Sequence, residues 1–340
     1  MENGLVACIP NFSEGRDHKV IHAIKLAIES VPQVKILHTD IGYSVNRTVI
    51  TFVGPPEQIV NAAFQGICKA LELIDMRNHI GTHPRMGAVD VCPLVPLKGI
   101  SMEEVILLAD NLAKKVGDIC HIPVYRYENN AKLKYRQKLS QIRGGEYEGW
   151  FQKINHPDWK PDFGPSAMPQ QAGVLAVGAR SIMIAFNVNL ASTDLDMAIQ
   201  IAREIRESGF ISKNIAGEKI INPGLCKGVR AIGWFIPEFN CAQVSMNLME
   251  LNETSLLKSF LTCEQLAKKY GLTVSGSEIV GMVPEKEILS AGNYFLSHSQ
   301  TQHSPKEVVS AAIAGLGLSD KGTFIPEEKI IEWRYNALAI

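Results

Sequence analysis

The chain has 340 residues, of which 46% are hydrophobic and 20% charged, a composition typical of a globular protein long enough for two domains. Its 34 basic and 35 acidic side chains nearly cancel, which argues against nucleic acid as a bulk electrostatic partner. The seven cysteines are scattered, and no signal peptide or uncharged apolar run of ~20 residues is evident, so we expect a cytoplasmic protein with reduced thiols and no membrane span.

The spacing of apolar residues predicts alternating strands and helices through the first half of the chain. The pattern indicates α+β architecture, with helices on one face of a mainly antiparallel sheet. The predicted strands cover residues 5–9, 34–40, 47–53, 86–91 and 121–127, and the predicted helices cover 20–28, 56–71 and 101–116. The last of these helices has a capping box in Ser101 and Glu104.

A polar segment from 129 to 161 follows, which we interpret as a connecting region with a basic, amphipathic helix near 131–142. The next segment, 162–173, is rich in glycine, proline and glutamine and predicts a loop.

The second half repeats the layout of the first, although no sequence repeat proves a duplication. Ser304-Pro305-x-Glu307 predicts one further helix near the C-terminus. We therefore expect two similar α/β subdomains, residues 1–178 and 179–340. The predicted strands of the second half of the chain are 174–177, 181–188, 229–236, 242–248 and 273–279, and its predicted helices are 195–208 and 254–270.

The segment from Ile74 to Pro93 is the most suggestive stretch for chemistry. Gly81 and Pro84 break any helical pattern, so it predicts an irregular loop that presents His83. An ordinary histidine has a pKa of ~6.5 and exchanges protons near neutral pH, which suits an acid or a base.

Other candidates are weaker on the residues alone. His79 and His83 have metal-ligand spacing, but the broken helix and the lack of a third ligand argue against a metal. Asp40 ends a predicted strand before a glycine, where a carboxylate can face a cleft or only cap a turn. Arg47 and Arg85 could bind carboxylates or be ordinary surface cations. No phosphate loop, nucleophile elbow or dinucleotide fingerprint occurs.

Several motifs, collinear over almost the whole chain, resemble the formiminotransferase family. They are Pro10-Asn11-Phe12-Ser13-Glu14-Gly15, Asn46-Arg47-Thr48-Val49, Phe52-Val53-Gly54-Pro55-Pro56, Ile74-Asp75-Met76, His83-Pro84-Arg85-Met86-Gly87-Ala88-Val89-Asp90-Val91-Cys92-Pro93, Arg143-x-Gly145-Glu146-Tyr147-Glu148, Pro161-Asp162-Phe163-Gly164-Pro165, Gly178-Ala179-Arg180, Ile184-Ala185-Phe186-Asn187-Val188-Asn189 and Gly233-Trp234. The resemblance implies transfer of the formimino group from N-formimino-L-glutamate to N5 of tetrahydrofolate, a step of histidine degradation. It also implies a folate cleft between two subdomains, a homodimer and tetrahydrofolate as co-substrate.

The resemblance also assigns roles to residues. It implies that His83 is the catalytic acid and base, and we expect Asp40 to orient it or to stabilise the cationic substrate. Arg47 and Arg85 are candidates for the substrate carboxylates, and no metal is expected. The implied folate-binding loop is Gly164, Pro165, Ser166, Ala167, Met168, Pro169, Gln170, Gln171, Ala172 and Gly173.

Two alternatives stay open from the sequence: a folate-binding protein of the same fold without catalysis, and an enzyme that uses a formyl donor. Animal relatives fuse this domain to a cyclodeaminase, so we expect this chain, which ends without one, to lack the ammonia-releasing activity. We expect neither nucleic acid nor membrane partners.

Overall fold

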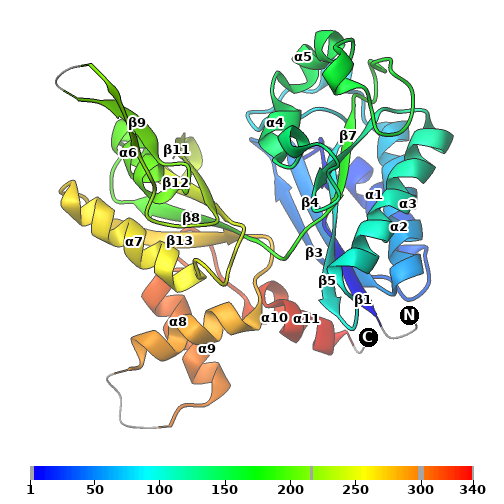
Figure 1. Cartoon of the computed structure of the whole chain (residues 1–340). Helices are drawn as coiled ribbons and strands as arrows, with labels where there is room; N and C mark the ends of the chain where they lie inside the picture. Colours follow the sequence, from blue (N-terminus) through cyan, green and yellow to red (C-terminus); the bar gives the residue numbers. More distant parts are fainter. Residues whose placement is uncertain (1–3, 215–216, 298–301, 339–340) are drawn as a thin grey trace. The chain divides into compact units, whose positions relative to one another are not determined.

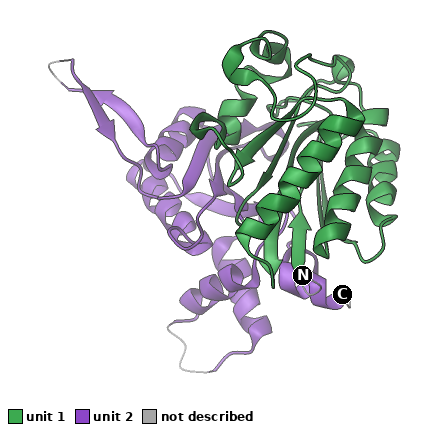
Figure 2. Ribbon diagram, turned by 45° about the vertical axis from the view of Figure 1, so that its right-hand side comes forward, with its two compact units in different colours: residues 1–182, 340 green, residues 183–339 purple. Residues whose placement is uncertain are grey.

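The computed structural model describes residues 4–214, 217–297 and 302–338. They fall into two compact units, with the change from the first to the second between Ile182 and Met183 (Figure 2). Each unit has its own hydrophobic core.

Unit 1 combines one large sheet with helices (Figure 1). Its strands are β1 (Leu5–Cys8), β2 (Asn11–Phe12), β3 (Lys35–Gly42), β4 (Arg47–Gly54), β5 (Val89–Lys98), β6 (Val124–Glu128) and β7 (Leu175–Ala179). Its helices are α1 (His18–Glu29), α2 (Pro56–Leu73), η1 (Met76–Asn78), α3 (Met102–Cys120), η2 (Lys134–Arg136), α4 (Leu139–Arg143), α5 (Glu146–Lys153) and η3 (Pro157–Trp159).

Local side-chain chemistry sets where these helices begin. The carboxylate of Asp17 accepts from two backbone N–H groups at the start of α1. The capping box predicted at Ser101 and Glu104 forms at the start of α3, and Pro56 occupies the first turn of α2, where its missing N–H is not needed. These caps satisfy backbone donors that would otherwise lack a partner.

The sheet of unit 1 runs in the order β1-β4-β2-β5-β7-β6, with β3 pairing at the edge of β4. Its pairings are antiparallel except those of β7, which is parallel to both β5 and β6. Helices α1, α2 and α3 cover one face over the larger core (Figure 1). On the opposite face, a smaller core of Tyr125, Trp150 and their neighbours packs beneath α4 and α5.

The rest of that opposite face carries polar side chains. Asp40 and Asn11 both pair with Val49, so the three positions lie at one level on adjacent strands. Arg47 lies two residues before Val49 on β4 and therefore shares its face of the sheet. This polar face is where the candidate site forms.

Unit 2 is built on a four-stranded antiparallel sheet in the order β11-β12-β8-β13. Its strands are β8 (Ile184–Leu190), β9 (Phe210–Lys213), β10 (Lys219–Asn222), β11 (Val229–Ile236), β12 (Cys241–Leu248) and β13 (Val274–Val280). Its helices are α6 (Leu195–Ile205), η4 (Pro237–Phe239), α7 (Leu256–Lys269), α8 (Glu285–Phe295), α9 (Pro305–Leu316), α10 (Pro326–Lys329) and α11 (Ile331–Ala337).

The two faces of this second sheet differ in chemistry. One face packs Phe186 and its neighbours against the helices of unit 2. On the other, Trp234 donates to Gln243, Gln243 donates to Asn189, and Asn189 donates to Asp320. A polar chain of this kind keeps buried amides hydrogen-bonded, as burial requires.

The α+β prediction is confirmed, but two local predictions are wrong and one hairpin was missed. The helix predicted near 131–142 is wrong: the segment contains only the short η2 and α4, because Arg136 is buried and donates to Asp158, Lys160 and Asp162 instead of facing solvent. Four helices, α8 to α11, occupy the C-terminal part where one was predicted. The hairpin β9–β10 was not predicted.

The capping box at Ser304 forms as predicted at the start of α9. Within the described ranges, no helix is both long and apolar enough to cross a membrane.

Candidate active site around His83

The loop after η1 is held in place by Asn46, the last residue of the turn between β3 and β4. The Asn46 side chain accepts from Gly15 N at 2.9 Å and donates to Ile80 O at 3.0 Å. Its carbonyl lies 2.9 Å from His79 Nε2. Gly81 allows the loop to lie close to the turn between β3 and β4, since a Cβ there would lie 2.3 Å from the carbonyl oxygen of Val45. The loop is therefore irregular, as predicted, but fixed.

His79 has a structural role, because it helps to hold the loop against Asn46. Arg85 Nε donates to His79 Nδ1 at 3.2 Å, so Nε2 carries the proton and donates to Asn46 O. Both ring nitrogens are thus engaged within the protein. Burial lowers the pKa of His79, which favours this neutral form.

His83 has the opposite arrangement of protons. Its Nδ1 lies 2.7 Å from the carbonyl oxygen of Pro84 and must donate to it, so the neutral ring has its lone pair on Nε2. Burial, with the charges of Arg47 and Arg143, lowers the pKa of His83 to about 3. The imidazole is therefore a neutral proton acceptor at physiological pH.

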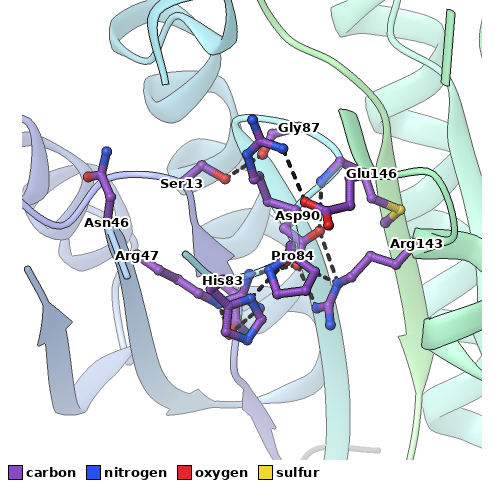
Figure 3. A network of polar contacts seen from close by, with 12 residues as sticks. Ser13, Asn46, Arg47, His83, Pro84, Gly87, Asp90, Arg143 and Glu146 are labelled. Carbon is purple, nitrogen blue, oxygen red and sulfur yellow. Dashed lines mark hydrogen bonds and ion pairs between the residues drawn. The ribbon is translucent and has the colours of Figure 1, made fainter. Parts of the chain in front are cut away.

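A cluster of three charged side chains lies beside this ring (Figure 3). Asp90, at the start of β5, is fully buried and accepts from Arg47 Nη1 at 2.7 Å and from Arg143 Nη2 at 2.6 Å. Arg47 also donates through Nε and Nη2 to Asn11. We call Arg47, Asp90 and Arg143 the arginine–aspartate cluster.

The cluster is fully charged at neutral pH. Burial raises the pKa of Asp90, but Arg143 and Arg47 outweigh it and bring the value to about 2. Burial lowers the pKa of Arg47 to about 10, with Asp90 acting in the opposite direction. Two guanidinium groups therefore share one carboxylate, and the cluster carries a net charge of +1 beside His83.

Arg85 belongs to a separate, acidic group. Its Nη2 donates to Glu148 at 2.7 Å, and its Nη1 lies 3.3 Å from Glu146. These three residues, with His79, Ile80, Gly81 and Gly145, line an open cavity of about 490 Å³. The cavity borders the loop on the side of His79.

The loop from Gly164 to Gly173 packs against the His83 loop. Ala88 N donates to Ala172 O at 2.8 Å, and Met76 N donates to Gln171 O at 2.9 Å. Gly173 has a φ of 72°, and a Cβ there would lie 2.3 Å from Met86 O, so only glycine fits this approach. Two segments about 80 residues apart in the sequence thus form one surface in unit 1.

The structure places the residues predicted from the sequence as follows. His83 and Arg47 come together at the cluster, whereas Arg85 lies with the glutamates. Asp40 lies on the polar face of the sheet, with its carboxylate 3.9 Å from His38 Nε2. A contact between Asp40 and His83 stays a prediction. The carboxylate of Asp90 is the one whose charge raises the pKa of His83, against the larger effect of burial.

Asp90 and Arg143 were not among the predicted site residues. One signal could have found Asp90: it is the only charged residue in the apolar run 86–95, and a buried carboxylate requires cationic partners. Arg143 begins one of the motifs that carry the family resemblance, but its position 53 residues away in a polar segment did not indicate that it meets Asp90.

Among the described residues, no group of three or more His, Cys, Asp or Glu side chains could hold a metal ion. The chemistry that these residues offer is proton transfer at His83 Nε2 beside two guanidinium groups.

The chain matches two family descriptions in succession. Residues 5–180 match "Formiminotransferase domain, N-terminal subdomain", and residues 185–336 match "Formiminotransferase domain". The chain therefore belongs to the formiminotransferase domain family.

Individual relatives refine this assignment. The chain is 40% identical over 292 residues to the glutamate formimidoyltransferase of Streptococcus pyogenes serotype M1, covering 86% of this chain and 93% of that one. It is likewise 40% identical over 294 residues to the glutamate formimidoyltransferase of Thermoplasma acidophilum, covering 86% and 92%.

A longer relative is the formimidoyltransferase-cyclodeaminase of Dictyostelium discoideum, 43% identical over 332 residues. That match covers 97% of this chain but 60% of the relative. The chain thus spans about three fifths of the length of the bifunctional proteins it matches.

Proposed function

We propose that this chain is a glutamate formimidoyltransferase, which moves the formimino group of N-formimino-L-glutamate to N5 of tetrahydrofolate in histidine degradation. The products are 5-formiminotetrahydrofolate and L-glutamate. The observation that carries the proposal is the match, at 40% identity, to two enzymes of this name over 92–93% of their lengths. Tetrahydrofolate is the co-substrate, and the proposed enzyme is cytoplasmic and homodimeric.

The tautomer of His83 fits the proton transfers of this reaction. As N5 of the folate attacks the formimino carbon, it must lose a proton, and His83 Nε2 has the lone pair to accept it. When the bond to the glutamate nitrogen breaks, the same proton passes from His83 to that nitrogen. Proton count and charge balance over the two steps, and no further reactant is needed.

The low pKa of the free imidazole changes when substrate arrives. N-formimino-L-glutamate has two carboxylates, and the arginine–aspartate cluster lowers the pKa of His83 through its positive charges. An anion bound there offsets these charges and raises the pKa of His83. The bound substrate thus makes His83 a stronger base.

The remaining assignments are parts of the same proposal. The loop 164–173, which contacts the His83 loop, binds folate. Asp40 stabilises the amidinium of the substrate from the polar face of the sheet. Arg47 takes part in binding a substrate carboxylate, whereas Arg85 has two glutamates against its one charge and suits this task less.

The test is turnover by the purified protein. We expect 5-formiminotetrahydrofolate and L-glutamate to form from the two substrates, followed by mass spectrometry. Folate binding without product would favour a non-catalytic folate-binding protein, and turnover only with N-formyl-L-glutamate would identify a formyl-transferring variant.

The role of His83 is tested by His83→Asn. We expect a rate lower by ~10²–10⁴-fold with folate binding retained, as for loss of an acid–base group. His156→Asn is the matched control, because His156 is exposed and its side chain contacts Asp158 of its own turn. A His83→Asn rate close to that of the control would remove His83 from the mechanism.

A further inference from the structure

Arg143 has hydrogen-bonding capacity that the protein does not use. Its Nε and Nη2 both donate to the carboxylate of Asp90. Among the described residues, no hydrogen bond from its Nη1 is found, and the side chain is 17% exposed. Two N–H groups of a fixed guanidinium are therefore available to a ligand.

A second arginine cluster in unit 1 shows what a purely structural arrangement looks like. Arg126 donates to Asp110 and Asp162, and Arg136 donates to Asp162. Two guanidinium groups there meet two carboxylates, and the charges cancel.

The arginine–aspartate cluster differs because its two guanidinium groups share one carboxylate. A partly buried excess positive charge is costly unless an anion reaches it. It also lies beside His83, whose pKa responds to both arginines. Charge and position together indicate an anion site at the reacting group.

We infer that Arg143, through Nη1, binds one of the two carboxylates of N-formimino-L-glutamate, and that Asp90 is the positioning residue that holds Arg143 for this task. The inference rests on the proposed function, since it names the anchor of the substrate at the same site. A guanidinium is suited to this role because its planar fork matches a carboxylate.

Asp90 fixes the orientation of that fork. Its carboxylate accepts from the backbone N–H of Met86 at 3.0 Å as well as from both arginines. Arg143 is the last residue of α4 and is followed by Gly144 and Gly145, so the chain turns away immediately beyond it. The donor is thus set in place before the substrate binds, which limits the entropy lost on binding.

The test measures binding without turnover. Calorimetry is run with saturating 5-methyltetrahydrofolate, whose N5 is already substituted and cannot accept the formimino group. The ligands are N-formimino-L-glutamate, N-formiminoglycine, which lacks the side-chain carboxylate, and 4-(formimino)aminobutyrate, which lacks the α-carboxylate. The proteins are the wild type, Arg143→Lys and the control Arg77→Lys, because Arg77 is an exposed arginine paired with Asp75.

We expect Arg143→Lys to bind N-formimino-L-glutamate about 10- to 100-fold more weakly, the size of one lost charge-assisted interaction, while Arg77→Lys matches the wild type. The analogue that lacks the carboxylate held by Arg143 should bind Arg143→Lys as tightly as it binds the wild type. Equal losses for all three ligands, or none, would overturn the inference while leaving the proposed function intact. Absence of wild-type binding to every ligand, with folate bound, would overturn the proposed function as well.

A second measurement uses the wild type alone and does not depend on how the variant folds. Phenylglyoxal modifies accessible guanidinium groups, and peptide mass spectrometry locates them. We expect N-formimino-L-glutamate to protect Arg143 but not Arg77. Equal modification of Arg143 with and without the ligand would count against the inference.

Discussion

One backbone carbonyl fixes which nitrogen of His83 carries the proton, while burial and two arginines lower the pKa of the ring. A histidine whose pKa lies below its usual value is neutral in the folded protein at pH values where it is protonated in the unfolded chain. The folded state therefore loses stability as the pH falls below the ordinary histidine range, toward the folded pKa of about 3.

We predict that the His83 ring does not titrate between pH 5 and 8 in the free protein. Nuclear magnetic resonance of ¹⁵N-labelled histidine should show the neutral form with the proton on Nδ1 throughout this range. A His83 midpoint near the ordinary value of ~6.5 would contradict the prediction.

Asp90 is the residue on which the arrangement of the cluster depends. We predict that Asp90→Asn destabilises the fold by about 3–5 kcal/mol, because it leaves two partly buried guanidinium groups without their anion. Urea unfolding at pH 7 measures the change. Asp75→Asn removes a carboxylate from an exposed pair with Arg77 and should leave stability nearly unchanged. Similar losses in the two variants would mean that the cluster is not a stabilising unit.

At the scale of elements, the pattern of apolar residues predicted well where local chemistry decides the structure. The capped helices α3 and α9 begin where Ser101 and Ser304 indicated. The helix predicted near 131–142 was wrong, because the buried Arg136 donates to the backbone carbonyls of Asp158 and Lys160, 22 and 24 residues further along the chain. The arginine–aspartate cluster joins side chains 43 and 53 residues apart, so only tertiary structure assembles it. The resemblance, in contrast, pointed to the His83 loop directly.

Two pairs of cysteines have their sulfur atoms equally close but lie in different surroundings. One pair joins two helices, and the other joins two strands. The sulfur atoms of Cys68 in α2 and Cys120 in α3 are 3.5 Å apart and partly exposed. Those of Cys8 in β1 and Cys92 in β5 are also 3.5 Å apart but fully buried. The hydrogen bond from Cys120 lowers the pKa of Cys68 to about 7, against the effect of burial and with help from Lys115, whereas burial raises the pKa of Cys8.

We predict that hydrogen peroxide oxidises Cys68 and Cys120 to a disulfide in the native protein and leaves Cys8 and Cys92 as thiols. The thiolate of Cys68 first attacks an oxygen of the peroxide, which breaks the O–O bond and gives a sulfenic acid and water. The Cys120 thiol then displaces the second water from the sulfenic acid, and the disulfide forms. Mass spectrometry of peptides alkylated after oxidation identifies the pairs. Oxidation of both pairs at the same rate would show that exposure and pKa do not control reactivity here.

On the scale of the whole molecule, the complete cluster belongs to unit 1. His83, Asn46, Arg47, Asp90 and Arg143, together with the loop 164–173, all lie before residue 182. Unit 1 has two hydrophobic cores of its own, one on each face of its sheet, and unit 2 has a third. Such a division favours independent folding of the units.

We predict that a fragment of residues 1–182 folds by itself and keeps the arginine–aspartate cluster, because no contact described for the cluster involves unit 2. Circular dichroism should show a cooperative thermal transition, and Asp90→Asn should lower its midpoint in the fragment as in the full chain. The fragment should be inactive as a transferase, because the match to the glutamate formimidoyltransferases extends beyond unit 1. A fragment without a cooperative transition would show that unit 1 depends on unit 2 for folding, and an active fragment would place the whole reaction in unit 1.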